Sequence, residues 1–239
     1  MKKYPWFLCS LLFISALSFQ SCDDDDDPET YSLAIGTLMK NESKNYYLEL
    51  DSEKKFLPTD SAIINYYKVG EGQRVLTTFA TSENQVTGYD RVIQIVDLYK
   101  ILTKPVVKMT EAMNDSIGDD KIEIEDMWIS KNFLNIRFQM MGANQKSHML
   151  NLVSTETPKQ PEEGYQTLEF RHNLEGDCPA RLYWGIVSFN LGDLSKGDLK
   201  GLKIRVNTIY RGEQFYNIDF EKRQPTPKLN PAEFKLGVR

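Results

Sequence analysis

The chain has 239 residues, 29 of them basic and 34 acidic, and a net charge of −5. Because positive charge is spread along the sequence and outnumbered by negative charge, there is no basic stripe for nucleic-acid phosphates, and we expect no nucleic-acid partner. The three cysteines, Cys9, Cys22 and Cys178, are too few for a four-cysteine zinc site and too far apart for a CxxC redox motif.

Residues 1–21 have the three parts of a secretory signal peptide. Two lysines follow Met1, an apolar run extends from Trp6 to Phe19, and small or neutral residues precede Cys22. The run has roughly 14 residues, whereas a membrane-spanning helix needs about 20, so the pattern does not predict a spanning segment. Ser21 followed by a cysteine resembles the lipobox of bacterial lipoproteins, in which the cysteine becomes the first residue of the mature chain.

Cys22 is therefore the predicted lipidation site. Its sulfur would carry a diacylglycerol and its amine an acyl chain such as palmitate, and several chains together hold a protein durably on a bilayer. The membrane is thus an expected partner through this anchor. Processing would leave Cys178 as the remaining thiol, which excludes an intramolecular disulfide. The alternative is a secreted protein whose Cys22 thiol is unmodified.

Residues 22–30 predict an acidic tether. Five aspartates follow the cysteine at once: Asp23, Asp24, Asp25, Asp26 and Asp27. Adjacent like charges repel one another and bury nothing, so we expect an extended, solvated segment that ends at Pro28. The run resembles the export signal that sends lipoproteins to the outer face of the outer membrane, and we expect the protein there, facing the cell exterior. The alternative is that the run is only a spacer.

Residues 31–110 predict a small β-barrel domain. Apolar and polar residues alternate with period two through four segments, and turn-forming residues separate these segments. The first segment is expected to present Leu33, Ile35, Thr37 and Met39 on one face. The predicted strands are Leu33–Met39, Tyr46–Leu50, Val75–Thr81 and Tyr89–Ile101.

Residues 111–239 predict an antiparallel β-sandwich. A polar stretch from Lys104 to Asp120 indicates a connection between domains, and we place the boundary near residue 110. Beyond it, about seven short strands alternate without intervening helical periodicity, so the whole fold is predicted to be all-β. The clearest strands are Leu134–Met140, Leu168–Leu174, Leu182–Ile186, Leu202–Val206 and Tyr216–Phe220.

Glycine and glutamate patterns do not predict an active site. Gly70 and Gly72 open a GxG pattern, but Val75 and a strand follow, which favours a turn over a phosphate cradle. Glu123 and Glu125 alternate with isoleucines, which favours a solvated strand face over the paired carboxylates of glycoside chemistry.

The histidines, the last cysteine and the aspartates of the connection also favour structural roles. His148 and His172 fall in register with apolar neighbours in predicted strands, so we expect hydrogen-bonded core or core-edge residues. The acidic neighbour Asp177 disfavours a thiolate at Cys178. Three aspartates lack the regular spacing of a calcium loop: Asp115, Asp119 and Asp120. We expect no metal, no cofactor and no enzymatic activity.

Two tyrosine doublets are the candidate ligand-binding residues. They are Tyr46 with Tyr47 and Tyr66 with Tyr67. A doublet on a strand places one ring on each side of the sheet, and an outward ring can stack on a sugar or pack against an apolar partner. The alternative is that the outward rings only cover the sheet. The expected ligand is a protein or a glycan.

Several motifs taken together resemble the NigD-like lipoproteins. In chain order they are Gly70–Val75, Gly88–Asp90, Leu98–Lys104, Trp128–Ser130, Phe133–Ile136, Leu168–Asn173 and Val187–Phe189. The resemblance covers essentially the whole mature chain and implies an N-terminal OB-type barrel joined to a C-terminal β-sandwich. The chain departs from the family pattern at Ser52–Lys54, where an Asp-Gly turn is expected.

The same resemblance implies a class of function. The family is named after a gene beside a bacteriocin, and its members are described as immunity proteins, which would bind a toxin or shield its target. We therefore expect a non-enzymatic, surface-exposed outer-membrane lipoprotein that binds a partner, with bacteriocin immunity as one role. The alternative is an accessory subunit of a cell-envelope complex, either structural or binding a glycan or protein.

Overall fold

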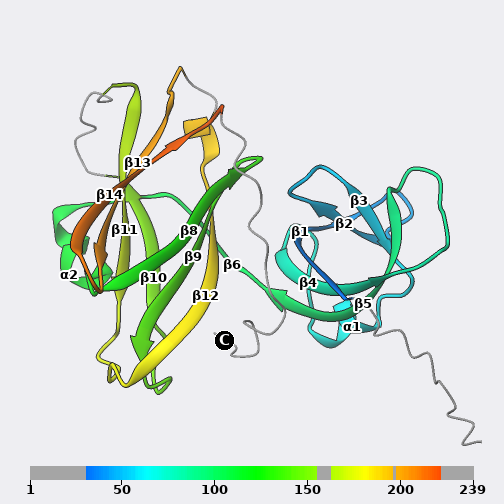
Figure 1. The fold of residues 1–239 in the computed structure, drawn as a ribbon, viewed down its shortest axis with the longest axis horizontal. Coiled ribbons are helices and arrows are strands. Elements are labelled where there is room, and N and C mark those ends of the chain that lie inside the picture. The colour runs from blue at the N-terminus through cyan, green and yellow to red at the C-terminus, as the bar shows by residue number, and fades with distance from the viewer. Residues whose placement is uncertain (1–30, 155–162, 196–197, 222–239) are drawn as a thin grey trace, which may run out of the picture.

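The computed structural model describes residues 31–154, 163–195 and 198–221. Within these residues the chain folds into an N-terminal barrel and a C-terminal sandwich, which lie side by side (Figure 1). The expected all-β fold is confirmed, whereas the expected signal peptide and tether lie outside the described residues. No helix in the described ranges is long and apolar enough to cross a membrane.

The barrel closes five strands in the order β1-β2-β3-β5-β4. The strands are β1 (Ser32–Lys40), β2 (Tyr46–Leu50), β3 (Lys55–Pro58), β4 (Arg74–Thr81) and β5 (Arg91–Lys100). Apolar residues from every strand fill the interior, among them Leu38, Leu48, Phe56, Val75 and Ile93. The short helix α1 (Ala62–Tyr66), which the sequence patterns did not predict, adds the buried Ile64 to this core.

Strands β1 and β5 depart from the simple alternation expected of them. Leu38 packs in the barrel interior, whereas Ile35 packs in a separate cluster against the sandwich, so β1 is buried on both faces. In β5 the pairing register shifts opposite Thr78 and Phe79, and Val96 at the shift is 41% exposed. Leu33 and Ile35 share one face as expected, and the sequence did not predict that the opposite face is buried too, because this strand has the barrel core on one side and the sandwich on the other.

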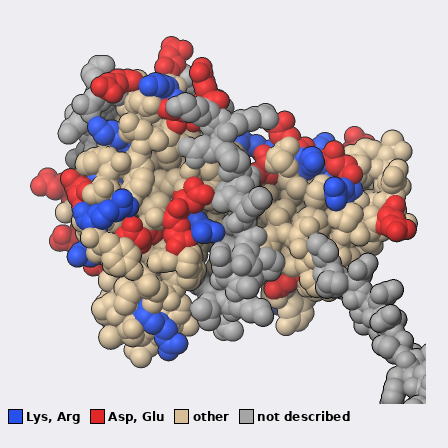
Figure 2. All heavy atoms as spheres, in the orientation of Figure 1, with Lys and Arg blue, Asp and Glu red and all other residues tan. Residues whose placement is uncertain are grey.

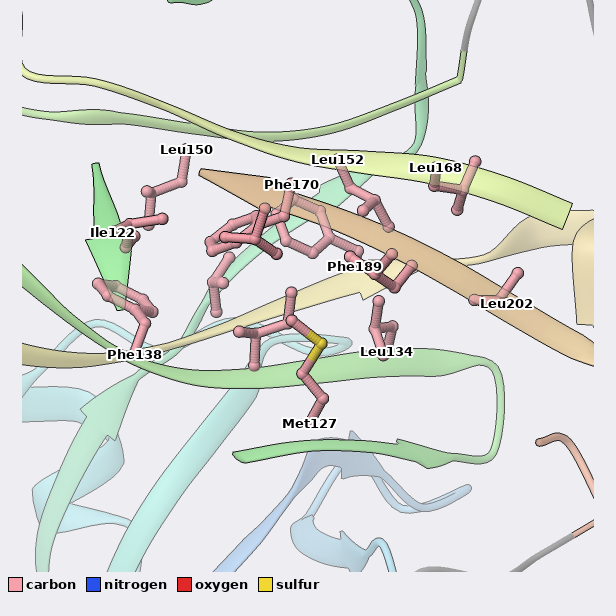
Figure 3. Packing of buried hydrophobic residues seen from close by; sticks show 14 of the residues in the cluster. Ile122, Met127, Leu134, Phe138, Leu150, Leu152, Leu168, Phe170, Phe189 and Leu202 are labelled. Carbon is pink, nitrogen blue, oxygen red and sulfur yellow. The ribbon is translucent and has the colours of Figure 1, made fainter. Parts of the chain in front are cut away.

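The sandwich packs a five-stranded sheet, β14-β13-β11-β10-β7, on a four-stranded sheet, β6-β12-β9-β8. Phe170 lies centrally between them, with its ring centroid 6.2 Å from Phe138 and 5.8 Å from Phe189 (Figure 3). The strands are β6 (Leu102–Pro105), β7 (Val107–Lys108), β8 (Ile122–Ser130), β9 (Phe133–Gly142), β10 (Met149–Ser154), β11 (Tyr165–Asn173), β12 (Arg181–Asn190), β13 (Gly201–Thr208) and β14 (Gly212–Asp219). The short helices are η1 (Glu111–Met113), α2 (Asn114–Ile117) and η2 (Gly192–Ser195).

Three strand pairs of the sandwich are parallel, which differs from the antiparallel arrangement expected. They are β6 with β12, β7 with β10, and β11 with β13. The last pair has a topological reason. Strand β12 follows β11 in the chain but lies in the opposite sheet, so the chain returns to the first sheet running in the direction of β11.

The chain passes from barrel to sandwich earlier than residue 110. Ile101, the residue directly after β5, is buried. The next residues, Leu102–Pro105, already form β6, which pairs with β12. Val107–Lys108 then pairs with β10 in the other sheet. Strands β6 and β7 thus each form an edge strand of one sheet of the sandwich. Ile101, which directly precedes β6, therefore lies at the junction between the two bodies.

A buried arginine joins the two bodies. Arg74 at the start of β4 is fully buried, and its guanidinium makes two parallel hydrogen bonds of 2.8 Å to the carboxylate of Asp51 in the barrel. The same group donates to Ser188 Oγ at 3.0 Å and to Asn135 Oδ1 at 2.8 Å in the sandwich. Around it lies an apolar cluster drawn from both bodies: Ile35, Leu76, Ile101, Trp128 and Ile186. Paired charge and apolar contact together hold the barrel against the sandwich.

Candidate ligand-binding cavity

A cavity of about 560 Å³ opens where the barrel meets the sandwich. The barrel contributes residues around the start of β4 and the end of β5, and the sandwich contributes β6, the end of β9, β12 and the segment 143–148 that leads into β10. A second hollow of about 890 Å³ shares part of this wall. Side chains lining both are Leu102, Lys146, Ser147, His148 and Leu150.

The barrel side of the cavity is held by a glutamine. The Gln73 amide nitrogen donates to the carbonyl oxygens of Arg74 at 3.0 Å and Ile101 at 2.9 Å. It thereby ties the start of β4 to the end of β5, directly beside the buried Arg74. The phenol of Tyr99 lies on the same wall, and burial raises its pKa.

Two histidines and an aspartate form a hydrogen-bonded row at the sandwich wall, and His148 of this row lines both hollows. His148 Nε2 lies 3.1 Å from Asp177 Oδ2, and His148 Nδ1 lies 3.0 Å from His172 Nε2. His172 Nδ1 in turn lies 3.2 Å from the carbonyl oxygen of Lys121. The row therefore begins at a carboxylate and ends at a carbonyl, and both of these groups only accept hydrogen bonds.

Both ring nitrogens of His148 are engaged in this row, one toward Asp177 and the other toward His172. Burial, and then electrostatic repulsion from His148, lower the pKa of His172 to about 4, so His172 is neutral near pH 7. His148 therefore has no free ring nitrogen that could act as a base toward a bound molecule.

Asp177 fixes the segment that forms the sandwich wall. Its Oδ2 accepts hydrogen bonds from the amides of Ala143 at 2.8 Å and Asn144 at 3.0 Å. Burial alone would raise the pKa of Asp177, but the donors from Ala143 and His148 lower it to about 2. One ionised carboxylate thus orients both the His148 ring and the turn that carries Lys146 and Ser147.

Gly142 leaves the space that this arrangement needs. A Cβ at this position would lie 3.0 Å from His148 Cε1 and 3.2 Å from Asp177 Oδ2. We therefore predict that Gly142→Ala lowers the free energy of unfolding by about 1–3 kcal/mol, the range for overpacking. Gly70→Ala is the matched control, because a Cβ there meets nothing within 4 Å. Chemical denaturation of both variants measures the difference, and equal stabilities would contradict the tight packing at Gly142.

The tyrosine doublets predicted as binding residues lie elsewhere. Tyr46 and Tyr47 are half-buried on β2, where the Tyr47 ring meets Tyr89 edge-on at 5.9 Å. Tyr66 is 76% exposed at the end of α1, and the Tyr67 hydroxyl donates to Asp97 at 2.9 Å, which raises the pKa of Tyr67. The second doublet is thus on a helix end and not on a strand, and none of the four side chains lines the cavity. Their binding role stays a prediction.

Other predicted positions differ in their surroundings. His172 lies in β11 as expected, but His148 lies in the segment before β10 and not in a strand. Glu123 and Glu125 do not form a solvated face: Glu123 contacts Arg211 at 3.5 Å, and Glu125 pairs with Arg137 at 2.9 Å. Cys178 is exposed, and the predicted lipidation and export residues, Cys22 and Asp23–Asp27, lie outside the described residues.

The cavity itself was not predicted from the sequence. Its walls come from segments that are far apart in the chain, and its polar residues Gln73, Asn144, Gln145 and Ser147 lie outside the strands. The one available signal was the pair of histidines, since the sequence holds only two and the structure brings them together.

Comparison with known proteins gives a consistent family match. Residues 35–101 match the NigD-like N-terminal OB domain, and residues 105–220 match the NigD-like C-terminal beta sandwich domain. No curated protein matches the chain.

Several solved structures have a fold similar to that of this chain. A protein of unknown function from Bacteroides vulgatus has a TM-score of 0.74 and 30% identity, covering 85% of this chain and 98% of its own. A protein from Parabacteroides distasonis, named for a presumed relation to a toxin, has a TM-score of 0.63 and 31% identity over 79% of this chain and 92% of its own. A NigD-like immunity protein from Bacteroides caccae has a TM-score of 0.56 and 14% identity over 80% of this chain and 91% of its own, so that likeness concerns the fold alone.

Proposed function

The chain belongs to the NigD-like family, and from this premise we propose that it is a lipid-anchored binding protein of the cell surface that captures a ligand in the junction cavity. The observation that carries the proposal is the cavity itself. Ligand sites are commonly concave, a few hundred to a thousand Å³ in volume, and placed between domains. The cavity of about 560 Å³ between barrel and sandwich has this size and position.

Binding without catalysis agrees with the chemistry of the cavity wall. The family and its immunity-named relative suggest a non-catalytic protein. A general base needs a nitrogen or oxygen within hydrogen-bond reach of the substrate proton, but both ring nitrogens of His148 are taken by Asp177 and His172. His148 therefore supports the wall and does not transfer protons to a bound molecule.

Anchoring at the cell surface rests on the N-terminal sequence. Cys22 ends a signal peptide and would carry the lipid, and Asp23–Asp27 would direct the anchored protein to the outer face of the outer membrane. Mass spectrometry of the native chain should find an acylated Cys22 as its first residue. Protease added to intact cells should degrade the protein, whereas full protection would place it inside the outer membrane.

Bacteriocin immunity is the role that we propose for this capture. A surface-anchored protein that holds a toxin, or the surface group that the toxin recognises, would protect the cell that carries it. The name of the Bacteroides caccae relative points to the same role. The cavity favours this capture over simple docking in an envelope complex, because docking needs a broad exposed apolar face and not a concave polar-lined site.

The test is a deletion strain challenged with bacteriocins from related strains. We expect the deletion to increase sensitivity to at least one bacteriocin, and the wild-type gene to restore resistance. The Gln145→Trp variant should fail to restore it, because Gln145 lines the cavity and an indole there would occupy the space. Gln85→Trp is the matched control, since Gln85 is exposed on the barrel and outside the cavity. Unchanged sensitivity across a broad panel would count against immunity.

A further inference from the structure

We propose that the junction cavity and the adjoining hollow that shares its wall recognise a ligand through an anionic group, a carboxylate or a phosphate. Lys146, which lines both hollows, and Lys104, which lines the second, would hold this group. This inference rests on the proposed capture function and adds the chemical class of the ligand.

Charge in the cavity is one-sided. Lys100 and Lys146 line the first hollow, where none of the described lining residues is acidic. Lys104 and Lys146 line the second, where Glu175 is the one carboxylate among the described lining residues. On the face of the protein shown in Figure 2, by contrast, acidic and basic side chains are interspersed. The cavity therefore differs from that surface in having an excess of positive charge.

Lys104 is a half-buried cation whose described partners are neutral. Its Nζ donates to the carbonyl oxygen of Leu150 at 2.8 Å and to the side-chain oxygen of Asn151. Burial lowers the pKa of Lys104, because these dipoles replace water only in part. An ammonium group has three donors, so a bound anion can take the third and supply the missing opposite charge.

Lys146 brings a second cation to the wall that the two hollows share. Its Nζ donates to the backbone carbonyl oxygen of Glu175 at 2.9 Å and so accounts for one of its three donors. The turn that carries Lys146 is held by Asp177, whose carboxylate faces the amides of Ala143 and Asn144 and does not line either hollow. Asp177 Oδ2 is therefore already occupied by His148 and two backbone amides.

The rest of the wall suits the body of a ring-shaped ligand. Tyr99 and Tyr183 offer aromatic surface, and Met140 offers an apolar contact. Amide and hydroxyl groups from Gln145 and Ser147 lie at the same wall and can bind hydroxyl groups. A sugar acid combines a carboxylate, hydroxyl groups and an apolar ring face, so glucuronate is a suitable probe and inorganic phosphate tests the anionic group alone.

The experiment is a calorimetric titration of the full mature, lipidated chain in uncharged detergent with glucuronate, inorganic phosphate and neutral glucose. We expect glucuronate to bind more tightly than glucose, with an affinity that falls as salt is added. Lys146→Gln and Lys104→Met should each weaken glucuronate binding about tenfold or more, the effect of one lost charged hydrogen bond. Lys54→Gln is the control, because Lys54 is exposed outside the cavity and its loss should leave the affinity unchanged.

Three outcomes would overturn the inference. They are equal binding of glucose and glucuronate, unchanged glucuronate affinity in both lysine variants, and no binding of either anion. Each of these outcomes can be distinguished from failure of the proposed function. The complementation test with Gln145→Trp and Gln85→Trp asks whether an open cavity is needed for resistance. Its result does not depend on the charge of the ligand. If Lys104→Met fails to fold, Lys146→Gln decides, since Lys146 is exposed and its Nζ makes one hydrogen bond.

Discussion

Replacing Arg74 with methionine should lower the free energy of unfolding by about 3–5 kcal/mol, the cost of breaking a buried ion pair by removing one partner. The guanidinium is fully buried and the side chain of Asp51 is 2% exposed, so the substitution leaves an uncompensated carboxylate away from water. It also removes the hydrogen bonds that reach Ser188 and Asn135 across the junction. Urea unfolding followed by tryptophan fluorescence measures this loss.

A double variant separates the charge from the packing. Arg74→Met combined with Asp51→Leu should recover much of the lost stability, because two apolar side chains replace the pair. Ser188 Oγ and Asn135 Oδ1 remain hydrogen-bonded to each other at 2.7 Å without the arginine. Lys131→Ala is the control across the same junction: its exposed pair with Glu49 at 3.2 Å should contribute about 1 kcal/mol or less. A loss of less than about 1 kcal/mol in Arg74→Met would contradict the role of Arg74 in joining the two bodies.

Acidification should destabilise the protein by up to about 3 kcal/mol through His172 alone. The pKa of His172 is about 4 in the folded protein and 6.5 unperturbed, so the unfolded chain binds more protons between these two values. Stability from this group is therefore fully present above pH 6.5 and is lost as the pH falls to 4. Burial is the main cause of the lowered pKa of His172, and electrostatic repulsion from His148 adds to it.

Unfolding curves collected at several pH values between 7 and 4 test this assignment. In His172→Gln the decline across this window should flatten, because the titrating group is gone. Loss of stability at lower pH should persist in that variant, since the pKa of Asp177 is about 2 when folded and its unperturbed value is 3.8. An unchanged decline between pH 6.5 and 4 in His172→Gln would show that another group causes it.

Alternation in the sequence was sufficient to predict most of the fold. It located most strands of both domains, though not β3 or β6, because each located strand has a core on at least one side, as Leu48 of β2 and Phe138 of β9 show. It did not predict that both faces of β1 are buried, with Ile35 on one face and Leu38 on the other. A local pattern indicates which residues are apolar, but it does not predict that a second domain covers the outer face of a strand such as β1.

The site was less accessible to sequence reasoning because its contacts are long-range. Arg74 follows a Gly-rich turn and was not predicted to have a structural role, yet three of its partners lie 23, 61 and 114 residues away. Asp177 was considered only as a neighbour of Cys178, whereas it acts on His148, 29 residues earlier. The tyrosine doublets were conspicuous in the sequence because they are adjacent, but adjacency carried no information about where the two domains would leave a cavity.

Site-specific photocrosslinking on intact cells tests most directly whether the junction cavity is where this protein binds. Benzoylphenylalanine would replace Tyr183, which lines the cavity, or Tyr210, which is 67% exposed and outside it. Cells irradiated in mixed culture with bacteriocin-producing strains should form an adduct, identified by mass spectrometry, at position 183 and not at position 210. Adducts at position 210 with none at position 183 would contradict capture in the cavity.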